Sequence, residues 1–156
     1  MNLTINDILK NSYVISIDPN RFCRFKEIFL RNGITNIPSL YKGFKLKLGT
    51  YYGCTLKQPS ILCCLTHLSI IKLAQINNLP FVCIFEDDAF PIKNIISEMN
   101  NVLHDTPDDI DVMKLGWTVM RDKEYRTYSD KLLVNTNTFG AHAYIVFKKY
   151  YNSYVD

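Results

Sequence analysis

Three consecutive carboxylates, Glu86, Asp87 and Asp88, directly follow the apolar run FVCIF at positions 81–85. Carboxylate oxygens are hard ligands that suit Mg²⁺ or Mn²⁺, and adjacent carboxylates repel one another unless a cation or a hydrogen-bond network compensates them. The candidate metal ligands are Asp88 together with Glu86 or Asp87. Because alternate residues of an extended segment point to the same side, Glu86 and Asp88 can share one cation while Asp87 points elsewhere. The alternative is that Asp87 or Asp88 caps a helix beginning near Pro91.

The elements that position these carboxylates alternate along the chain. Hydrophobic periodicity and Gly or Pro breaks predict strands at 13–17, 81–85, 111–115, 131–134 and 142–147, and helices at 21–32, 59–77 and 92–103. Gly33 is expected to close the first helix. The glycine-rich and lysine-rich segment 34–53 is predicted to be a flexible loop, with a functional role as one option, and 118–130 a polar loop.

This alternation predicts a single α/β domain over residues 1–156, with a mixed, mainly parallel sheet covered on both faces. The length supports one substantial core, and 47% hydrophobic with 21% charged residues is typical of a globular protein. In open α/β sheets ligands bind beyond the carboxyl ends of the strands, which is where the acidic triplet is expected.

Charge and cysteine content narrow the class further. A net charge of +3 with dispersed basic residues gives no strong signal for nucleic acid, so no nucleic-acid partner is expected. Five cysteines, an odd number without paired CxxC elements, are expected to be buried reduced thiols. No basic segment followed by a long apolar one opens the chain and no eighteen consecutive apolar residues occur, so we expect cytoplasmic residence.

Four blocks carry a resemblance to glycosyltransferase family 25, the lipopolysaccharide-biosynthesis glycosyltransferases. They are YVISIDPNRFCRFKEIFLRNGI (13–34), PSILCCLTHLSIIKLAQINNLPFVCIFEDDAF (59–90), DVMKLG (111–116) and GAHAYIVFKKY (140–150). The second is the most specific, since it resembles the family's Gly-Cys-x-x-Ser-His helix followed by its Glu-Asp-Asp-Ala signature. Departures include Leu62 in place of the glycine and Thr66 in place of the serine, which keeps a hydroxyl. The family usually continues through a further C-terminal region, so we expect a short or truncated member.

The resemblance implies a GT-A-like nucleotide-sugar-binding sandwich in which the acidic motif holds Mn²⁺ or Mg²⁺ against a diphosphate. The metal would stabilise the charge that develops on the departing phosphate. The implied partners are a nucleotide-sugar donor and a glycan or lipid-linked glycan acceptor, with peripheral association at the inner face of a membrane. The implied activity is hexosyl transfer, with UDP-galactose as the family's most familiar donor, to lipopolysaccharide or a related glycan.

Several further residues are candidates for binding the donor. Arg21 follows the first strand, and its planar guanidinium can bind phosphate bidentately; Arg24 is a near-equal candidate, and surface arginines are the alternative. His67 is expected to support the site structurally from within the apolar helix. Lys114 and Gly116 end a strand expected to lie beside the acidic one, where a lysine would approach phosphate and a glycine would admit the sugar.

The catalytic base must be a carboxylate or histidine near the acceptor hydroxyl. The sequence does not select among the candidates Asp111, Asp122, Glu124, His142 and Asp156. The only tryptophan, Trp117, is either a sugar-stacking residue or a half-buried core residue. Two other functions stay open: a catalytically weak or inactive nucleotide-sugar-binding domain, and another metal-dependent phosphotransferase.

Overall fold

The structure, a computed structural model, describes residues 3–45, 58–116, 126–134 and 140–155. Its centre is a five-stranded sheet with strand order β2-β1-β3-β7-β4. The strands are β1 (Ser12–Ser16), β2 (Ser39–Lys42), β3 (Phe81–Glu86), β4 (Val112–Lys114) and β7 (Ala143–Phe147). β2 and β3 pair with β1 in parallel, whereas β7 pairs antiparallel with β3 and with β4. The predicted α/β class and mixed sheet are therefore confirmed.

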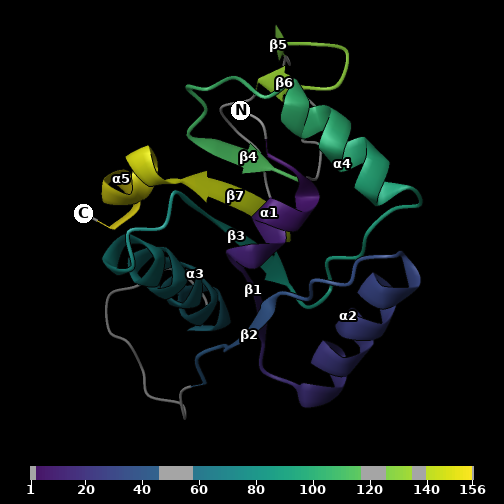
Figure 1. The fold of residues 1–156 in the computed structure, drawn as a ribbon. Coiled ribbons are helices and arrows are strands. Elements are labelled where there is room, and N and C mark those ends of the chain that lie inside the picture. Colours follow the sequence, from purple (N-terminus) through teal and green to yellow (C-terminus); the bar gives the residue numbers. More distant parts are fainter. Residues whose placement is uncertain (1–2, 46–57, 117–125, 135–139, 156) are drawn as a thin grey trace.

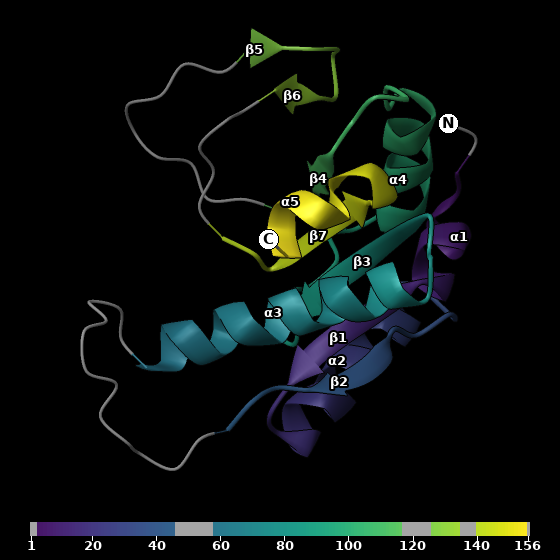
Figure 2. The ribbon, with the colours of Figure 1, turned by 90° about the vertical axis from the view of Figure 1, so that its left-hand side faces the viewer.

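Helices cover both faces of this sheet (Figure 1). α1 (Ile5–Lys10), α2 (Pro19–Arg31) and α4 (Ile95–His104) pack on one face, while α3 (Gln58–Ile76) and the short α5 (Tyr151–Val155) lie on the other, which Figure 2 views from the front. A 3₁₀ turn, η1 (Lys148–Tyr150), joins β7 to α5. The central strand β3 is buried from Phe81 to Phe85, with alternate side chains entering the two core clusters, as its continuous apolar run predicts.

Local sequence signals fix both ends of α2. Asp18 caps the amino end, its carboxylate accepting a hydrogen bond from the Asn20 backbone at 2.9 Å, and Pro19 occupies the first turn. Gly33 lies just beyond the carboxyl end with φ of +79°, and the Ile34 N–H donates to the Phe29 carbonyl at 3.0 Å, as in a Schellman motif. The tight junction from β1 into α2 places the first turn of α2 at the carboxyl edge of the sheet.

The predicted long helix is confirmed as α3. Its inner side packs through Ile70, Ile71 and Ala74, which are fully buried, while Leu65 and Ile76 are exposed. Within the described residues, the stretch Pro59–Ile76 has the length and apolar composition that would allow it to cross a membrane, but apolar core helices of soluble proteins share these properties. The helix carries Cys63 and His67 toward the carboxyl end of β3.

Two predictions about strands need correction. Residues 39–42, expected within a loop, form the edge strand β2, whose mostly exposed side chains give no alternating apolar signal. The predicted strand at 131–134 is observed only as β6 (Leu133–Val134), which pairs with β5 (Arg126–Thr127) outside the main sheet. No prediction was made for α1, a helix of only 6 residues whose amino end is stabilised by a capping box between Thr4 and Asp7.

Candidate functional site

The acidic triplet lies at the edge of the sheet where β1, β2 and β3 end. Glu86 is the last residue of β3, and a turn follows in which the Ala89 N–H donates to the Glu86 carbonyl at 3.0 Å. Because β7 is antiparallel to β3, it begins at this same edge, and the Glu86 N–H donates to the His142 carbonyl at 2.8 Å. The antiparallel pairing thereby brings together two residues that are 56 positions apart.

Glu86, Asp88 and His142 form one group of potential metal ligands. His142 Nδ1 lies 3.0 Å from Glu86 Oε2 and 3.6 Å from Asp88 Oδ1. One ligand atom from each residue lies within 4.8 Å of the others, and the His142 and Asp88 side chains are about half exposed. Two carboxylates and an imidazole on an open surface fit a divalent cation such as Mn²⁺. Glu86 and Asp88 face this group together, as the alternation argument expected.

Asp87 points away from this group and is buried. Its side chain is only 7% exposed, accepts a hydrogen bond from Ser16 Oγ at 2.6 Å and forms an ion pair with Arg21. Arg21 also lies 3.4 Å from Asp88. Neither Asp87 nor Asp88 caps α4, because that helix starts at Ile95 with Asn94 at its N-cap position. The capping alternative is therefore excluded for α4.

His67 supports Glu86 from α3. Its Nδ1 lies 2.8 Å from the Tyr144 hydroxyl, the two rings stack with centroids 5.6 Å apart, and its Nε2 is 3.4 Å from Glu86 Oε1. These contacts place His67 between the Tyr144 hydroxyl and the Glu86 carboxylate. Interaction with the His67 imidazole is the main cause that lowers the pKa of Glu86, and His142 adds to it, while burial acts in the opposite direction. Glu86 is thus held as a carboxylate between two imidazoles.

Cys63 completes the surroundings of Glu86. Its thiol lies 3.7 Å from Glu86 Oε1, and burial, followed by the Glu86 charge, raises the pKa of the thiol. The expectation of buried thiols is wrong for Cys23, Cys63 and Cys64, which are exposed; Cys83 is buried, and Cys54 lies outside the described residues. The contact follows from the tertiary structure, since no neighbour in sequence indicates it.

An open cleft of about 580 Å³ adjoins the acidic residues. Its lining combines polar and charged groups with apolar ones, and includes Ser16, Arg21, Gly43, Phe44, Lys45, Cys63, Thr66, Glu86, Asp87 and Asp88. Gly43 is buried at the wall, where a Cβ atom would lie 2.7 Å from Ile17 Cγ2, so a larger residue would require the Ile17 side chain to move. A volume of this order suits a small organic ligand.

The remaining candidates lie elsewhere or have other partners. Arg24 is exposed and packs its guanidinium over the Phe90 ring at 5.4 Å. Lys114 and Gly116 do not adjoin the acidic strand as expected, because β7 lies between β3 and β4. Lys114 instead donates to the Gly140 carbonyl at 3.0 Å, and burial lowers its pKa. A Cβ atom on Gly116 would meet nothing within 4 Å.

The candidates for the catalytic base are separated by the fold. Asp111 lies at the opposite end of the sheet, where its carbonyl accepts from the Phe147 N–H and its carboxylate pairs with Lys149 at 3.0 Å. The length of β7 separates it from the cleft, so the structure does not bring Asp111 to the site. His142 is at the site, among the carboxylates. Trp117, Asp122, Glu124 and Asp156 lie outside the described residues.

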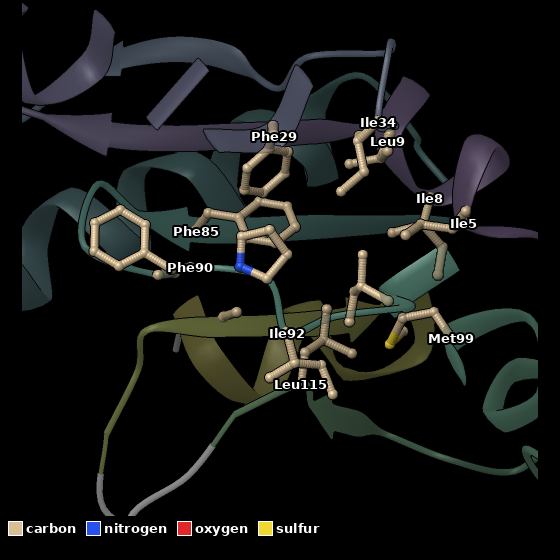
Figure 3. A pocket seen from close by; sticks show the side chains of 14 residues that line it. Ile5, Ile8, Leu9, Phe29, Ile34, Phe85, Phe90, Ile92, Met99 and Leu115 are labelled. Carbon is tan, nitrogen blue, oxygen red and sulfur yellow. The ribbon is translucent and has the colours of Figure 1, made fainter. Parts of the chain in front are cut away.

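A second, apolar cavity of about 130 Å³ lies between the sheet and the segment that leads into α4 (Figure 3). Phe29, Phe85, Phe90, Ile92 and Met99 are among the side chains that line it. No residue of its lining is ionisable, so the cavity offers packing space rather than chemistry.

Sequence reasoning missed two contributors to the site: Ser16, and Cys63 in contact with Glu86. Of these, only Ser16 could have been found from the sequence. It lies at an inward-facing position at the end of an apolar strand, and a buried hydroxyl needs a hydrogen-bond partner. Comparison with protein-family models and with curated proteins finds no match to this sequence.

Proposed function

We propose that this protein is a metal-dependent glycosyltransferase with a GT-A-like sandwich, which transfers a hexose from a nucleoside-diphosphate sugar to a lipopolysaccharide or related glycan. The proposal rests on the motif resemblance and on one structural observation. That observation is the group Glu86, Asp88 and His142 at the carboxyl edge of the sheet, where Glu86 and Asp88 also line an open cleft. UDP-galactose is the donor that the resemblance favours.

Each residue of the group has a role in this proposal. Glu86, Asp88 and His142 would hold Mn²⁺ or Mg²⁺, and the cation supplies charge stabilisation to the departing diphosphate when it is bound. Because His142 Nδ1 faces both carboxylates, we assign His142 to metal binding in preference to the role of base.

Arg21 and Lys45 supply positive charge along the cleft. The Arg21 side chain is 48% exposed, and its guanidinium can bind phosphate oxygens while Asp87 holds it in place. Asp87, fixed by Ser16, is therefore a positioning residue for Arg21 rather than a metal ligand. With a cation held by Glu86, Asp88 and His142, Arg21 and Lys45 would bind and orient the diphosphate through their charge.

The proposed acceptor, a glycan or a lipid-linked glycan, implies where in the cell the protein acts. We propose that the protein acts in the cytoplasm, at the inner face of the membrane that holds such an acceptor.

Calorimetry tests the donor site. We expect UDP and UDP-galactose to bind with Mn²⁺ and to bind weakly without it. Asp88→Asn should weaken the metal-dependent binding by more than about tenfold, because it removes a charged ligand. Asp111→Asn is the matched control, since it removes an exposed carboxylate at the far end of the sheet and should leave binding unchanged. Binding that is indifferent to Mn²⁺, or an unchanged affinity in Asp88→Asn, contradicts the proposal.

Product analysis separates the proposal from its alternatives. A glycosyltransferase releases UDP from UDP-galactose only when a glycan acceptor is present and attaches the hexose to that acceptor. An inactive binding domain binds the donor without releasing UDP, and a phosphotransferase moves a phosphate instead of the sugar.

A further inference from the structure

Glu86 faces a second group of ligand atoms on the side opposite His142. Cys63 and His67 are four residues apart on α3, so both side chains lie on one face of the helix and point toward the end of β3. Cys63 Sγ is 3.7 Å and His67 Nε2 is 3.4 Å from the same atom, Glu86 Oε1. All three ligand atoms lie within 4.8 Å of one another.

The Nε2 atom of the His67 imidazole is positioned to bind a ligand beside Glu86 Oε1. Its side chain is 9% exposed, and its Nε2 is buried and makes no hydrogen bond to any residue that the structure describes. Nδ1 is engaged by the Tyr144 hydroxyl at 2.8 Å. With a cation bound, Nδ1 would carry the proton and donate it to this hydroxyl, and the Nε2 lone pair would bind the cation in place of its present contact with the Glu86 carboxylate. Metal-ligating histidines use their second nitrogen in this way.

The spacing matches a tetrahedral ion. Zn²⁺ bonds of about 2.0 Å to nitrogen or oxygen and about 2.3 Å to sulfur place neighbouring ligand atoms roughly 3.5 Å apart. The two separations measured from Glu86 Oε1, 3.4 Å and 3.7 Å, lie on either side of that value.

We propose that Cys63, His67 and Glu86 bind a thiophilic divalent cation of the Zn²⁺ type, with a fourth position open to the cleft that Cys63 lines. Three protein ligands and one open position leave room for a water molecule or an anionic ligand oxygen. Glu86 presents Oε1 to this group and Oε2 to His142, so one carboxylate can serve both groups. The inference does not rest on the proposed function, because it needs no nucleotide.

Cobalt provides the test, because Co²⁺ replaces Zn²⁺ and shows an intense charge-transfer absorption only when a thiolate ligates it. We expect this absorption in the wild-type protein at one equivalent of Co²⁺, and its loss on addition of Zn²⁺. Cys63→Ser should abolish it. The matched control is Cys64→Ser, which removes the neighbouring exposed thiol and should keep the absorption. Circular dichroism of each variant verifies that the fold is retained.

Two outcomes overturn the inference: no thiolate absorption in the wild-type protein, or an absorption that survives in Cys63→Ser. Asp88→Asn separates this inference from the donor site, since it should lose Mn²⁺-dependent nucleotide binding and keep the cobalt absorption. If the cobalt absorption is absent while nucleotide binding persists, only the thiophilic site falls. If nucleotide binding is absent and the absorption is present, only the donor site falls.

Discussion

Asp87 and Asp88 are adjacent in sequence, yet the structure gives them opposite roles, and the pair of substitutions Asp87→Asn and Asp88→Asn measures this difference. Asp87 is 7% exposed and is bound by Ser16 and Arg21, whereas the Asp88 side chain is 50% exposed. We expect Asp87→Asn to reduce the free energy of unfolding and to leave the Mn²⁺ ligands in place. Asp88→Asn should leave the free energy of unfolding nearly unchanged and remove one of the Mn²⁺ ligands.

The magnitude follows from the contacts of Asp87. A hydrogen bond to a charged group contributes about 1.5 to 3 kcal/mol, and the Ser16 hydroxyl donates one at 2.6 Å. The ion pair adds at most about 1 kcal/mol, because the Arg21 side chain is 48% exposed and its charge is screened by water. Asparagine keeps one oxygen that can accept from Ser16, so we expect a net loss of about 2 kcal/mol for Asp87→Asn.

Urea and thermal unfolding followed by circular dichroism provide the assay. For a chain of this length, about 2 kcal/mol corresponds to a fall in Tm of roughly 4 to 8 °C. Asp88→Asn should change the free energy of unfolding by no more than about 0.5 kcal/mol. Equal losses in the two variants, or a loss confined to Asp88→Asn, would refute the assignment of Asp87 as the internal, structural carboxylate.

Two further predictions concern the cleft wall and the first helix. Gly43→Ala should lower the free energy of unfolding by about 1 to 3 kcal/mol, because the new Cβ would lie 2.7 Å from an Ile17 methyl group. Gly116→Ala is the control, because a Cβ atom there would meet nothing within 4 Å. Urea unfolding compares the two variants, and equal losses would contradict the close approach at Gly43. The hydrogen bond from the Thr4 hydroxyl, followed by the one from the Lys10 side chain, lowers the pKa of Asp7 to about 2. The stabilisation by the Asp7 carboxylate is therefore present above its unfolded pKa of about 3.9 and is lost as the pH falls toward 2. Thermal melts of wild type and Asp7→Asn should therefore differ at pH 7 and converge near pH 2, and a difference that grows on acidification would have the wrong sign.

The local pattern of the sequence was sufficient for the elements with strong signals. The apolar run of β3 predicted a strand buried on both faces, and Gly33 predicted the carboxyl end of α2, whereas the helix begins at Pro19, two residues before the predicted start. The sequence did not predict the edge strand β2 or the short α1. An exposed strand has no apolar alternation, and a helix of 6 residues has too few turns to show a periodicity.

The sequence also indicated which carboxylates point to the same side, because alternation along an extended segment is a property of the backbone alone. It separated Glu86 and Asp88 from Asp87, and the structure has this arrangement. It could not assign a partner to Asp87, since Ser16 is 71 positions away.

Only the tertiary structure decided how the strands are ordered and therefore which residues meet. Insertion of β7 between β3 and β4 carries His142 to Glu86 and removes Lys114 from the acidic strand. Packing of α3 against the sheet sets Cys63 and His67 against the same carboxylate. Contacts of this kind depend on strand order and helix docking, which arise from burial of the whole core and leave no mark in the spacing of residues along the chain.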